Sequence, residues 1–203
     1  MVRWQHPIVI LAALLLAPVG LRAQSLEASD LGAGKLLVAR QTDQRFAESV
    51  ILLVEYDSQG ALGLTINRSS NTPISETLRG GEEWSEPVYL GGPVEMSAVF
   101  ALLRSSDTQE EMQAVLEEVY WAASRPVLEK ILAAGPEAGE ARFFLGYSGW
   151  GAGQLDNEVR LGSWYIFDGS ADLVFDDDPA TLWDRLSEQT EQRFVRLGLI
   201  PAN

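Results

Sequence analysis

Short apolar runs, separated by turns that contain glycine or proline, make up most of the chain. The run SVILLVEY (49–56) is rich in branched residues and predicts a buried strand. The turn DSQG (57–60) and the run ALGLTIN (61–67) complete a predicted hairpin, in which Gly63 indicates a bulge or a close backbone approach. Other strands are expected at GKLLVA (34–39), on both sides of the Gly-Gly-Pro turn in PVYLGGPVEMSAVFALLRS (87–105), from about Val119, at ARFFLGY (141–147), at SWYIF (163–167) and at DLVF (172–175).

The clearest helical pattern is RPVLEKILAAG (125–135), where Pro126 lies in the first turn and Gly135 follows the last apolar position. Segment 110–118 could form a helix, whereas EVYWAA (118–123) alternates and favours a strand from about Val119; Ser69 to Asn71 is typical of a turn. Other helices are expected within SSNTPISETLRGG (69–81), at GQLDNEVRLG (153–162) and at DDDPATLWDRLSEQ (176–189), the last with Asp178 as N-cap and Pro179 at its first position. Strands outnumber helices and hairpins alternate with single helices, which predicts one α+β domain.

The first 23 residues have the pattern of a secretory signal peptide: a short basic start, an apolar run from Ile8 to Val19, and a small residue, Ala23, at the expected cut. The run is too short for a membrane span of about 20 residues. We therefore expect a signal peptide at 1–23, a flexible segment at 24–33 and a domain at 34–203. The expected compartment is the periplasm, without a membrane span after cleavage. The alternatives are an uncleaved anchor, or a cytoplasmic protein if the start codon is assigned too early.

Removal of this segment narrows the possible chemistry. The single histidine is His6 and there is no cysteine, so the mature chain would contain neither. A Ser-His-Asp triad, a thiolate nucleophile and the common zinc sites all need those side chains. We expect no catalytic residue, no metal site and no cofactor.

Net charge disfavours nucleic acid as a direct partner. The chain has 15 basic and 29 acidic residues, and loss of Arg3 and Arg22 would change the net charge from −14 to −16. Basic residues are scattered singly, whereas a duplex-binding surface concentrates lysine and arginine.

The stretch FFLGYSGWGAGQLDNEV (143–159) has four glycines within eight residues. Its glycine spacing differs from that of the dinucleotide-binding fingerprint, and it lacks the lysine of a P-loop. It also differs from the nucleophile elbow G-x-S-x-G, because Trp150 stands where the last glycine is needed, two positions after Ser148. The interpretation is a tight corner that turns a strand into a helix, with Trp150 packed beside it. Of the tryptophans Trp84, Trp121, Trp150, Trp164 and Trp183, most are expected in the core, and Trp150 is the first candidate for lining a pocket.

Carboxylates offer two weaker candidates. Asp156 and Glu158 are two positions apart on a predicted helix, so they do not face each other and are expected to be exposed. The acidic cluster Asp168, Asp172, Asp176, Asp177 and Asp178 could supply oxygen ligands to a hard cation, but it lacks calcium-loop spacing, and a solvated edge is the favoured interpretation.

Several blocks together resemble the YqgE/AlgH family: GKLLVA, SVILLVEY with GALGLTINR, LGGPV, LGYSGWGAGQLDNEV, and DLVF with Trp183, in order across about 34–198. The resemblance implies an α+β fold whose mixed, bifurcated sheet forms a pseudo-barrel with several short helices. It also implies a family often described as transcriptional regulators, without an established enzymatic activity. The family's shared residues map to a signature surface at Asn67, Gly91, Gly92, Pro93, Gly146, Tyr147, Trp150, Gln154, Leu155 and Glu158.

The chain departs from the family at Tyr56 and Arg104, where relatives commonly carry histidine, and in its leader-like start. The first hypothesis is therefore a non-enzymatic binding or regulatory protein acting on an unidentified protein or small ligand. The second is the transcriptional regulator that the family description suggests. The third is a carboxylate- or metal-dependent hydrolase using Asp156, Glu158 or the acids of 168–178.

Overall fold

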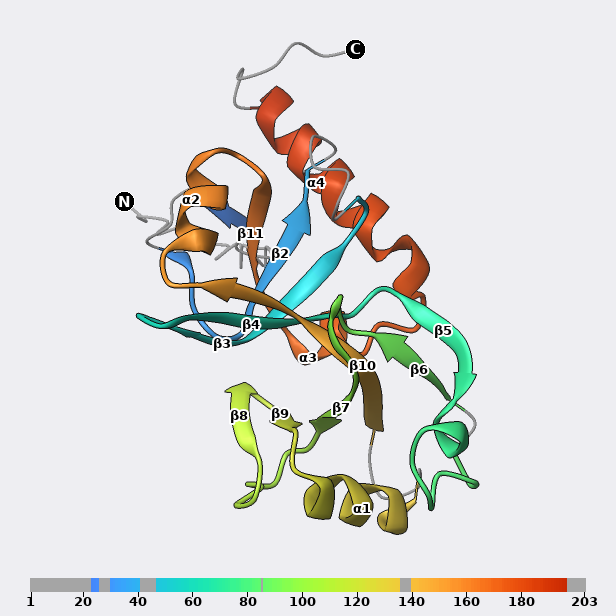
Figure 1. The fold of residues 1–203 in the computed structure, drawn as a ribbon. Coiled ribbons are helices and arrows are strands. Elements are labelled where there is room, and N and C mark those ends of the chain that lie inside the picture. Colours follow the sequence, from blue (N-terminus) through green and yellow to red (C-terminus); the bar gives the residue numbers. More distant parts are fainter. Residues whose placement is uncertain (1–22, 26–29, 41–46, 85, 136–139, 197–203) are drawn as a thin grey trace, which may run out of the picture.

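The computed structural model describes residues 23–25, 30–40, 47–84, 86–135 and 140–196 of the 203-residue chain (Figure 1). The strands are β1 (Ala23–Ser25), β2 (Lys35–Ala39), β3 (Val50–Asp57), β4 (Gly60–Thr65), β5 (Ser69–Pro73), β6 (Pro87–Leu90), β7 (Val94–Arg104), β8 (Gln113–Leu116), β9 (Val119–Ala122), β10 (Glu140–Gly151) and β11 (Trp164–Asp168). The α-helices are α1 (Arg125–Ala134), α2 (Gln154–Arg160), α3 (Ala171–Val174) and α4 (Leu182–Arg196), with 3₁₀ turns η3 (Ile74–Glu76) and η5 (Pro179–Thr181). The α+β single-domain prediction is confirmed.

The strands form one curled sheet in the order β1-β11-β2-β3-β4-β10-β7-β9-β8, and β6 joins β10 and β5 beside this path. All pairings are antiparallel except the one between β6 and β10. Strand β10 connects the two halves, because its first part pairs with β7 and β6 and its last four residues pair with β4. Figure 1 shows it crossing the middle of the molecule, between the β11-β2-β3 half and the β7-β8-β9 half. The bifurcated sheet that the resemblance implied is therefore present.

The switch of β10 from β7 to β4 falls between Tyr147 and Ser148, directly after a bulge at Gly146. The strand has a bulge between Leu145 and Tyr147, and Gly146 has a φ of 66° there. Glycine adopts this left-handed conformation at little cost, and bulges of this kind are how strands pass from one sheet to another. The predicted position of a tight corner, across the glycine stretch, is therefore wrong. Strand β10 continues through Gly151, and the chain turns toward α2 only at 152–153.

Apolar side chains form three clusters around the curled sheet. The largest lies between the sheet, α3 and α4, and contains Phe144, Phe167 and Trp183. A second lies between α1 and the β7-β9-β10 face, because α1 buries Val127, Leu128, Ile131 and Leu132 on one side. The third lies under α2. Among the described residues, no helix is both long and apolar enough to cross a bilayer.

The structure confirms several element predictions. The hairpin (β3 and β4), the strands around the Gly-Gly-Pro turn (β6 and β7), the strands at 34–39, from Val119 and at 163–167 (β2, β9 and β11), and the helices at 125–135 and 153–162 (α1 and α2) all form. Gly63 lies opposite a bulge between Leu53 and Glu55, as expected, and a Cβ there would lie 2.5 Å from Cγ2 of Ile51.

Three predictions are wrong. Segment 172–175 is not a strand: residues 172–174 belong to helix α3, and Phe175 follows it as the C-cap. Ser170 caps the start of α3 by accepting a hydrogen bond at Oγ from the Leu173 N–H (3.3 Å). Ser69–Asn71 belongs to strand β5, which pairs with β6, and the helix expected after it is only η3. The helix considered for 110–118 does not form, and residues 113–116 are instead strand β8.

The last helix begins as predicted, with Asp178 before Pro179, but first as the 3₁₀ turn η5 and then as α4. Residues 1–22 lie outside the described part, so the leader remains a prediction. Strand β1 pairs with β11 at the edge of the sheet and includes Ala23, the last residue of that predicted leader.

Candidate functional site

A buried carboxylate organises the stretch that follows β10. Oε2 of Glu158, on α2, accepts hydrogen bonds from Nε1 of Trp150 and Nε1 of Trp164, both at 2.9 Å. Its other oxygen accepts one from Nε2 of Gln154 at 3.1 Å. The two indoles meet edge to face, with ring centroids 6.1 Å apart. Because buried charges are tolerated only with hydrogen-bond partners, this arrangement ties β10, α2 and β11 together.

This geometry corrects the prediction that Asp156 and Glu158 are exposed. Glu158 is only 8% exposed. Asp156 is half-buried and accepts a hydrogen bond at Oδ1 from the hydroxyl of Tyr56, at 2.9 Å. Burial, with the hydrogen bond and negative charge of Asp156, raises the pKa of Tyr56. The two carboxylates do point to different partners, as their spacing predicted, so they do not form an acid–base pair.

The Gly-Gly-Pro turn and the glycines of β10 pack directly against each other. The Gly91 N–H donates to the Leu145 carbonyl at 2.9 Å. A Cβ on Gly92 would lie 2.2 Å from the carbonyl carbon of Tyr147, and one on Gly146 would lie 2.5 Å from the Gly92 carbonyl oxygen. These positions accept no side chain because backbone lies on backbone. The Gly-Gly-Pro turn and the glycine stretch, two signature segments that are 55 positions apart in sequence, are therefore in direct contact.

Asn67 acts at a different place. Its Oδ1 accepts from the Val50 N–H (2.9 Å) and its Nδ2 donates to the Glu48 carbonyl (2.8 Å). Glu48 is a non-glycine residue with a φ of 57°, so the asparagine holds the strained entry into β3. Leu155 is buried under α2, and Pro93 is exposed on its turn. Most signature side chains thus serve the fold.

A groove lies where the β3–β4 hairpin meets β10 and the start of β7. This hairpin groove has a volume of about 490 Å³ and is lined by Glu55, Asp57, Gln59, Gly60, Ala61, Leu62, Val94, Tyr147, Gly149 and Trp150. Small residues keep its floor open, and the Tyr147 ring lies over Gly149, where a Cβ would meet its Cε2 at 3.0 Å. Glu55 and Asp57 are exposed, and none of the described residues lining the groove is basic. Of the signature residues, only Tyr147 and Trp150 line it.

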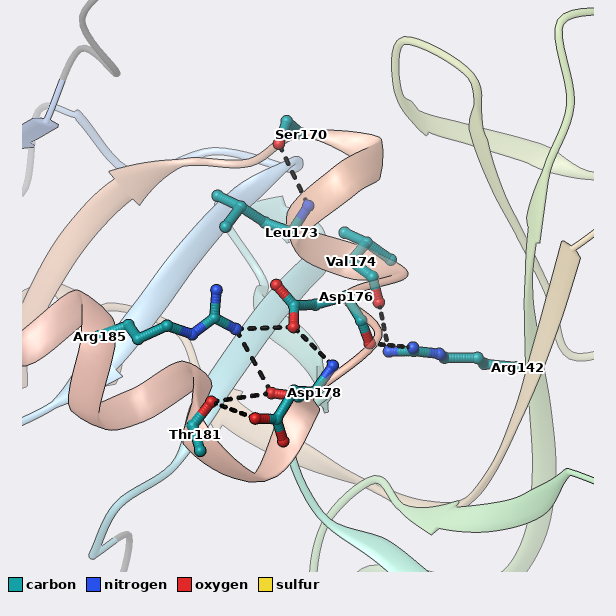
Figure 2. A network of polar contacts seen from close by, with 8 residues as sticks. All are labelled: Arg142, Ser170, Leu173, Val174, Asp176, Asp178, Thr181 and Arg185. Carbon is teal, nitrogen blue, oxygen red and sulfur yellow. Dashed lines mark hydrogen bonds and ion pairs between the residues drawn. The ribbon is translucent and has the colours of Figure 1, made fainter.

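A second polar network fastens the C-terminal segment to β10 (Figure 2). Arg142 donates to the carbonyls of Val174 (2.8 Å) and Asp176 (2.5 Å), and its guanidinium lies 5.0 Å from the Tyr89 ring centroid. Arg185 pairs with the Asp176 carboxylate at 2.7 Å. Motifs and spacing in the sequence do not identify Arg142 as a residue that fastens the C-terminal segment. The signal that could have found it is a single arginine within the apolar run ARFFLGY, since a charged side chain there needs a partner.

Asp176 is the titratable centre of this network. Burial alone would raise the pKa of its carboxyl, but hydrogen bonds from Arg185 and the Asp178 N–H, with the charges of Arg185 and Arg142, hold the pKa below its ordinary value. Of the other predicted acids, Asp172, Asp177 and Asp178 line one surface pocket together with Asp176, whereas Asp168 pairs with Lys35 (2.5 Å). Among the described residues, no three His, Cys, Asp or Glu side chains are grouped as metal ligands.

Arg104, where relatives commonly carry histidine, pairs with three acids: Asp172 (2.7 Å), Glu140 (3.6 Å) and Glu118 (3.8 Å). Ser148 is buried, and its Oγ has no hydrogen-bond partner among the described residues. It is therefore not presented to a substrate as a nucleophile would be. All five tryptophans of the described part are buried, as expected for the core, and Trp84 and Trp150 also line cavities.

Comparison with known proteins places this geometry in a family. A family model described as AlgH-like matches residues 36–194. The chain is 36% identical over 158 residues to a UPF0301 protein of Chlorobaculum parvum, which covers 76% of this chain and 84% of the relative. It is 37% identical over 158 residues to a UPF0301 protein of Chlorobium luteolum, with the same coverage of both chains.

Two solved structures share the fold. The solution structure of the AlgH protein from Pseudomonas aeruginosa superposes with a TM-score of 0.63 at 32% identity, covering 84% of this chain and 93% of the other. A crystal structure of a Corynebacterium diphtheriae protein superposes with a TM-score of 0.65 at 20% identity, covering 79% and 87%, and supports the fold alone. The resemblance read from the ordered sequence blocks is confirmed, and the chain belongs to the AlgH-like family.

Proposed function

We propose that this protein is a non-enzymatic binding protein that acts outside the cytoplasm, and that its partner inserts a positively charged segment into the hairpin groove. The observation that carries the proposal is the groove itself, where the signature aromatics Tyr147 and Trp150 lie beside the exposed carboxylates of Glu55 and Asp57. A proposed periplasmic location rests on the leader-like pattern of 1–23.

The use of the signature polar groups supports binding over catalysis. The side chains of Asn67, Gln154 and Glu158 make their hydrogen bonds within the chain: Asn67 with backbone, Gln154 with backbone and Glu158, and Glu158 with Gln154 and two indoles. A catalytic acid or base has to reach a substrate proton. Gln154 and Glu158, fixed in this way, instead hold Trp150 in the wall of the groove, and such preorganisation lowers the entropic cost of binding.

Charge supports a cationic partner. Two carboxylates face solvent at one side of the groove, and the whole chain has a net charge of −14. Complementary charge speeds encounter and disfavours partners of like charge. Gly60, Ala61 and Gly149 line the groove with small side chains or none, which leaves room for an extended segment.

The test is affinity capture from periplasmic extract, with the full chain as bait and captured proteins quantified by mass spectrometry. The bait variant Glu55→Gln/Asp57→Asn removes both groove charges and keeps the Asp57 oxygen that accepts from the Gln59 N–H at 2.7 Å. The control Glu188→Gln/Glu191→Gln removes two charges from the exposed face of α4. We expect a partner whose recovery falls at least tenfold with the groove variant only. Equal recovery with both variants would contradict the proposal.

A further inference from the structure

A second cavity lies on the other half of the sheet, between α1 and the segment that joins β7 to β8. Its volume is about 490 Å³, within the range of small-molecule sites. Apolar side chains that line it are Trp84, Leu103, Met112, Val127, Ile131 and Ala134. None of these residues belongs to the hairpin groove or to the signature surface.

The aromatic wall of this cavity, Trp84, has no hydrogen-bond donor left for a ligand to satisfy. Nε1 of Trp84 donates to the Leu132 carbonyl at 3.2 Å, so its only polar atom is satisfied inside the protein. The Trp84 ring is fixed edge to face against Phe143, with centroids 5.3 Å apart. Trp84 is only 5% exposed, so the indole offers the cavity a small but rigid carbon edge, which suits the apolar body of a ligand.

The rim is charged, and acids outnumber available cations. Lys130 of α1 forms an ion pair with Glu111, which comes from the segment before β8. Asp107 and Glu110 also line the cavity and are exposed, and the described residues give neither an ion pair with a basic side chain. Arg104 touches the same cavity, but its guanidinium is shared among Asp172, Glu140 and Glu118. The rim therefore carries a net negative charge.

We propose that this cavity binds a small amphipathic cation: an amine whose aromatic or aliphatic body lies against Trp84 and Ile131, with its ammonium group beside Asp107 and Glu110. The apolar floor supplies affinity by burial, and the acids select the sign of the head group. The site acts independently of the hairpin groove, so the two proposals stand or fall separately.

Isothermal titration calorimetry on the full chain tests this with three probes of one shape: phenylbutylamine, phenylbutyrate and phenylbutanol. We expect saturable one-to-one binding of the amine, with at least tenfold weaker binding of the alcohol and of the carboxylate. Equal affinity for the carboxylate, or no saturable binding of the amine, would overturn the proposal.

Two variants locate the bound amine. Ala134→Trp fills the cavity from the exposed end of α1, whereas Ala133→Trp places the same side chain on the same helix outside the cavity lining. We expect the first to weaken amine binding at least tenfold and the second to leave it unchanged. Asp107→Asn/Glu110→Gln is expected to weaken binding of the amine and not of the alcohol. If Ala134→Trp binds the amine as the wild type does, the cavity is not the site.

Discussion

The indole N–H of Trp164 lies 2.9 Å from Oε2 of Glu158, and both side chains are buried. Trp150 of β10 donates to the same oxygen, so one carboxylate holds two tryptophans that are 14 positions apart and come from strands that do not pair. This explains why an acid occurs in a family signature without any catalytic partner: it replaces water as the acceptor for two buried indoles.

Glu158→Gln is expected to destabilise the protein by about 1–3 kcal/mol, because an amide has one oxygen where the carboxylate has two. If the new amide oxygen accepts from the two indoles, the NH₂ group of the same amide has to point toward Nε2 of Gln154. Two hydrogen-bond donors then face each other. Urea unfolding followed by tryptophan fluorescence measures the loss. Asp156→Asn, on the same helix, keeps an oxygen for Tyr56 and should cost less. Equal losses in the two variants would contradict the role assigned to Glu158.

The packing of the Gly-Gly-Pro turn on β10 gives a second prediction. Gly92→Ala places a Cβ 2.2 Å from a backbone carbon of Tyr147, which cannot move aside as a flexible side chain can. We expect the free energy of unfolding to fall by at least about 2 kcal/mol, which is in the upper part of the range for overpacked sites. Gly32→Ala is the control, since a Cβ added at Gly32 would have nothing within 4 Å. Thermal unfolding compares the two, and a stable Gly92→Ala variant would show that the turn does not lie on β10.

Much of the fold follows from local pattern. The runs at 49–56 and 61–67 and the helix at 125–135 predicted β3, β4 and α1, because apolar periodicity and the flanking turn residues agree there. DLVF has the composition of a strand but forms part of α3, because a Ser170 cap and the packing of Val174 decide its conformation. Local propensity is only a weak prior where tertiary contacts compete with it.

The candidate site was less predictable. Spacing indicated that Asp156 and Glu158 face apart, but not that Glu158 is buried, because its donors Trp150 and Trp164 come from two other elements. The glycine stretch was predicted as a tight corner, whereas Gly146 is a point where the backbone of β10 lies against another backbone segment. Its partner, the Gly-Gly-Pro turn, could not be found without the topology that brings β6, β7 and β10 together.

Acid titration should reveal the Asp176 network. The pKa of Asp176 is lower in the folded protein than its ordinary value of 3.8, so its contribution to stability is fully present above that value. The contribution is lost as the pH falls from there through the folded pKa. Asp176→Asn should therefore be less stable than the wild type at neutral pH, and the difference should shrink at low pH. Urea unfolding at several pH values measures it, and a difference independent of pH would contradict the network. Asp177→Asn, at an exposed neighbour, is the control.

Direct binding to duplex DNA is not expected. With 29 acidic and 15 basic residues, the chain repels the phosphate backbone, whose neutralisation supplies most non-specific affinity. A mobility-shift assay with a random duplex at low salt should show no retarded band at micromolar protein. A basic DNA-binding protein run in parallel verifies the assay. A retarded band that disappears as salt rises would favour the regulator hypothesis over the proposed binding function.

The intact mass of the protein recovered from a bacterial periplasm tests the predicted leader. We expect a chain that starts at Gln24, without Arg3 and Arg22 and with a net charge of −16. The cut would fall inside β1, where Ala23 pairs with Phe167 and Ser25 with Ile166, so cleavage has to precede completion of this edge of the sheet. Ala23→Arg, which replaces the small residue at the cut, should therefore leave the leader attached and the protein bound to the membrane. Absence of the wild type from the periplasmic fraction, with a full-length mass in the cytoplasmic or membrane fraction, would instead place the protein, and its partner, on the cytoplasmic side or at a membrane anchor.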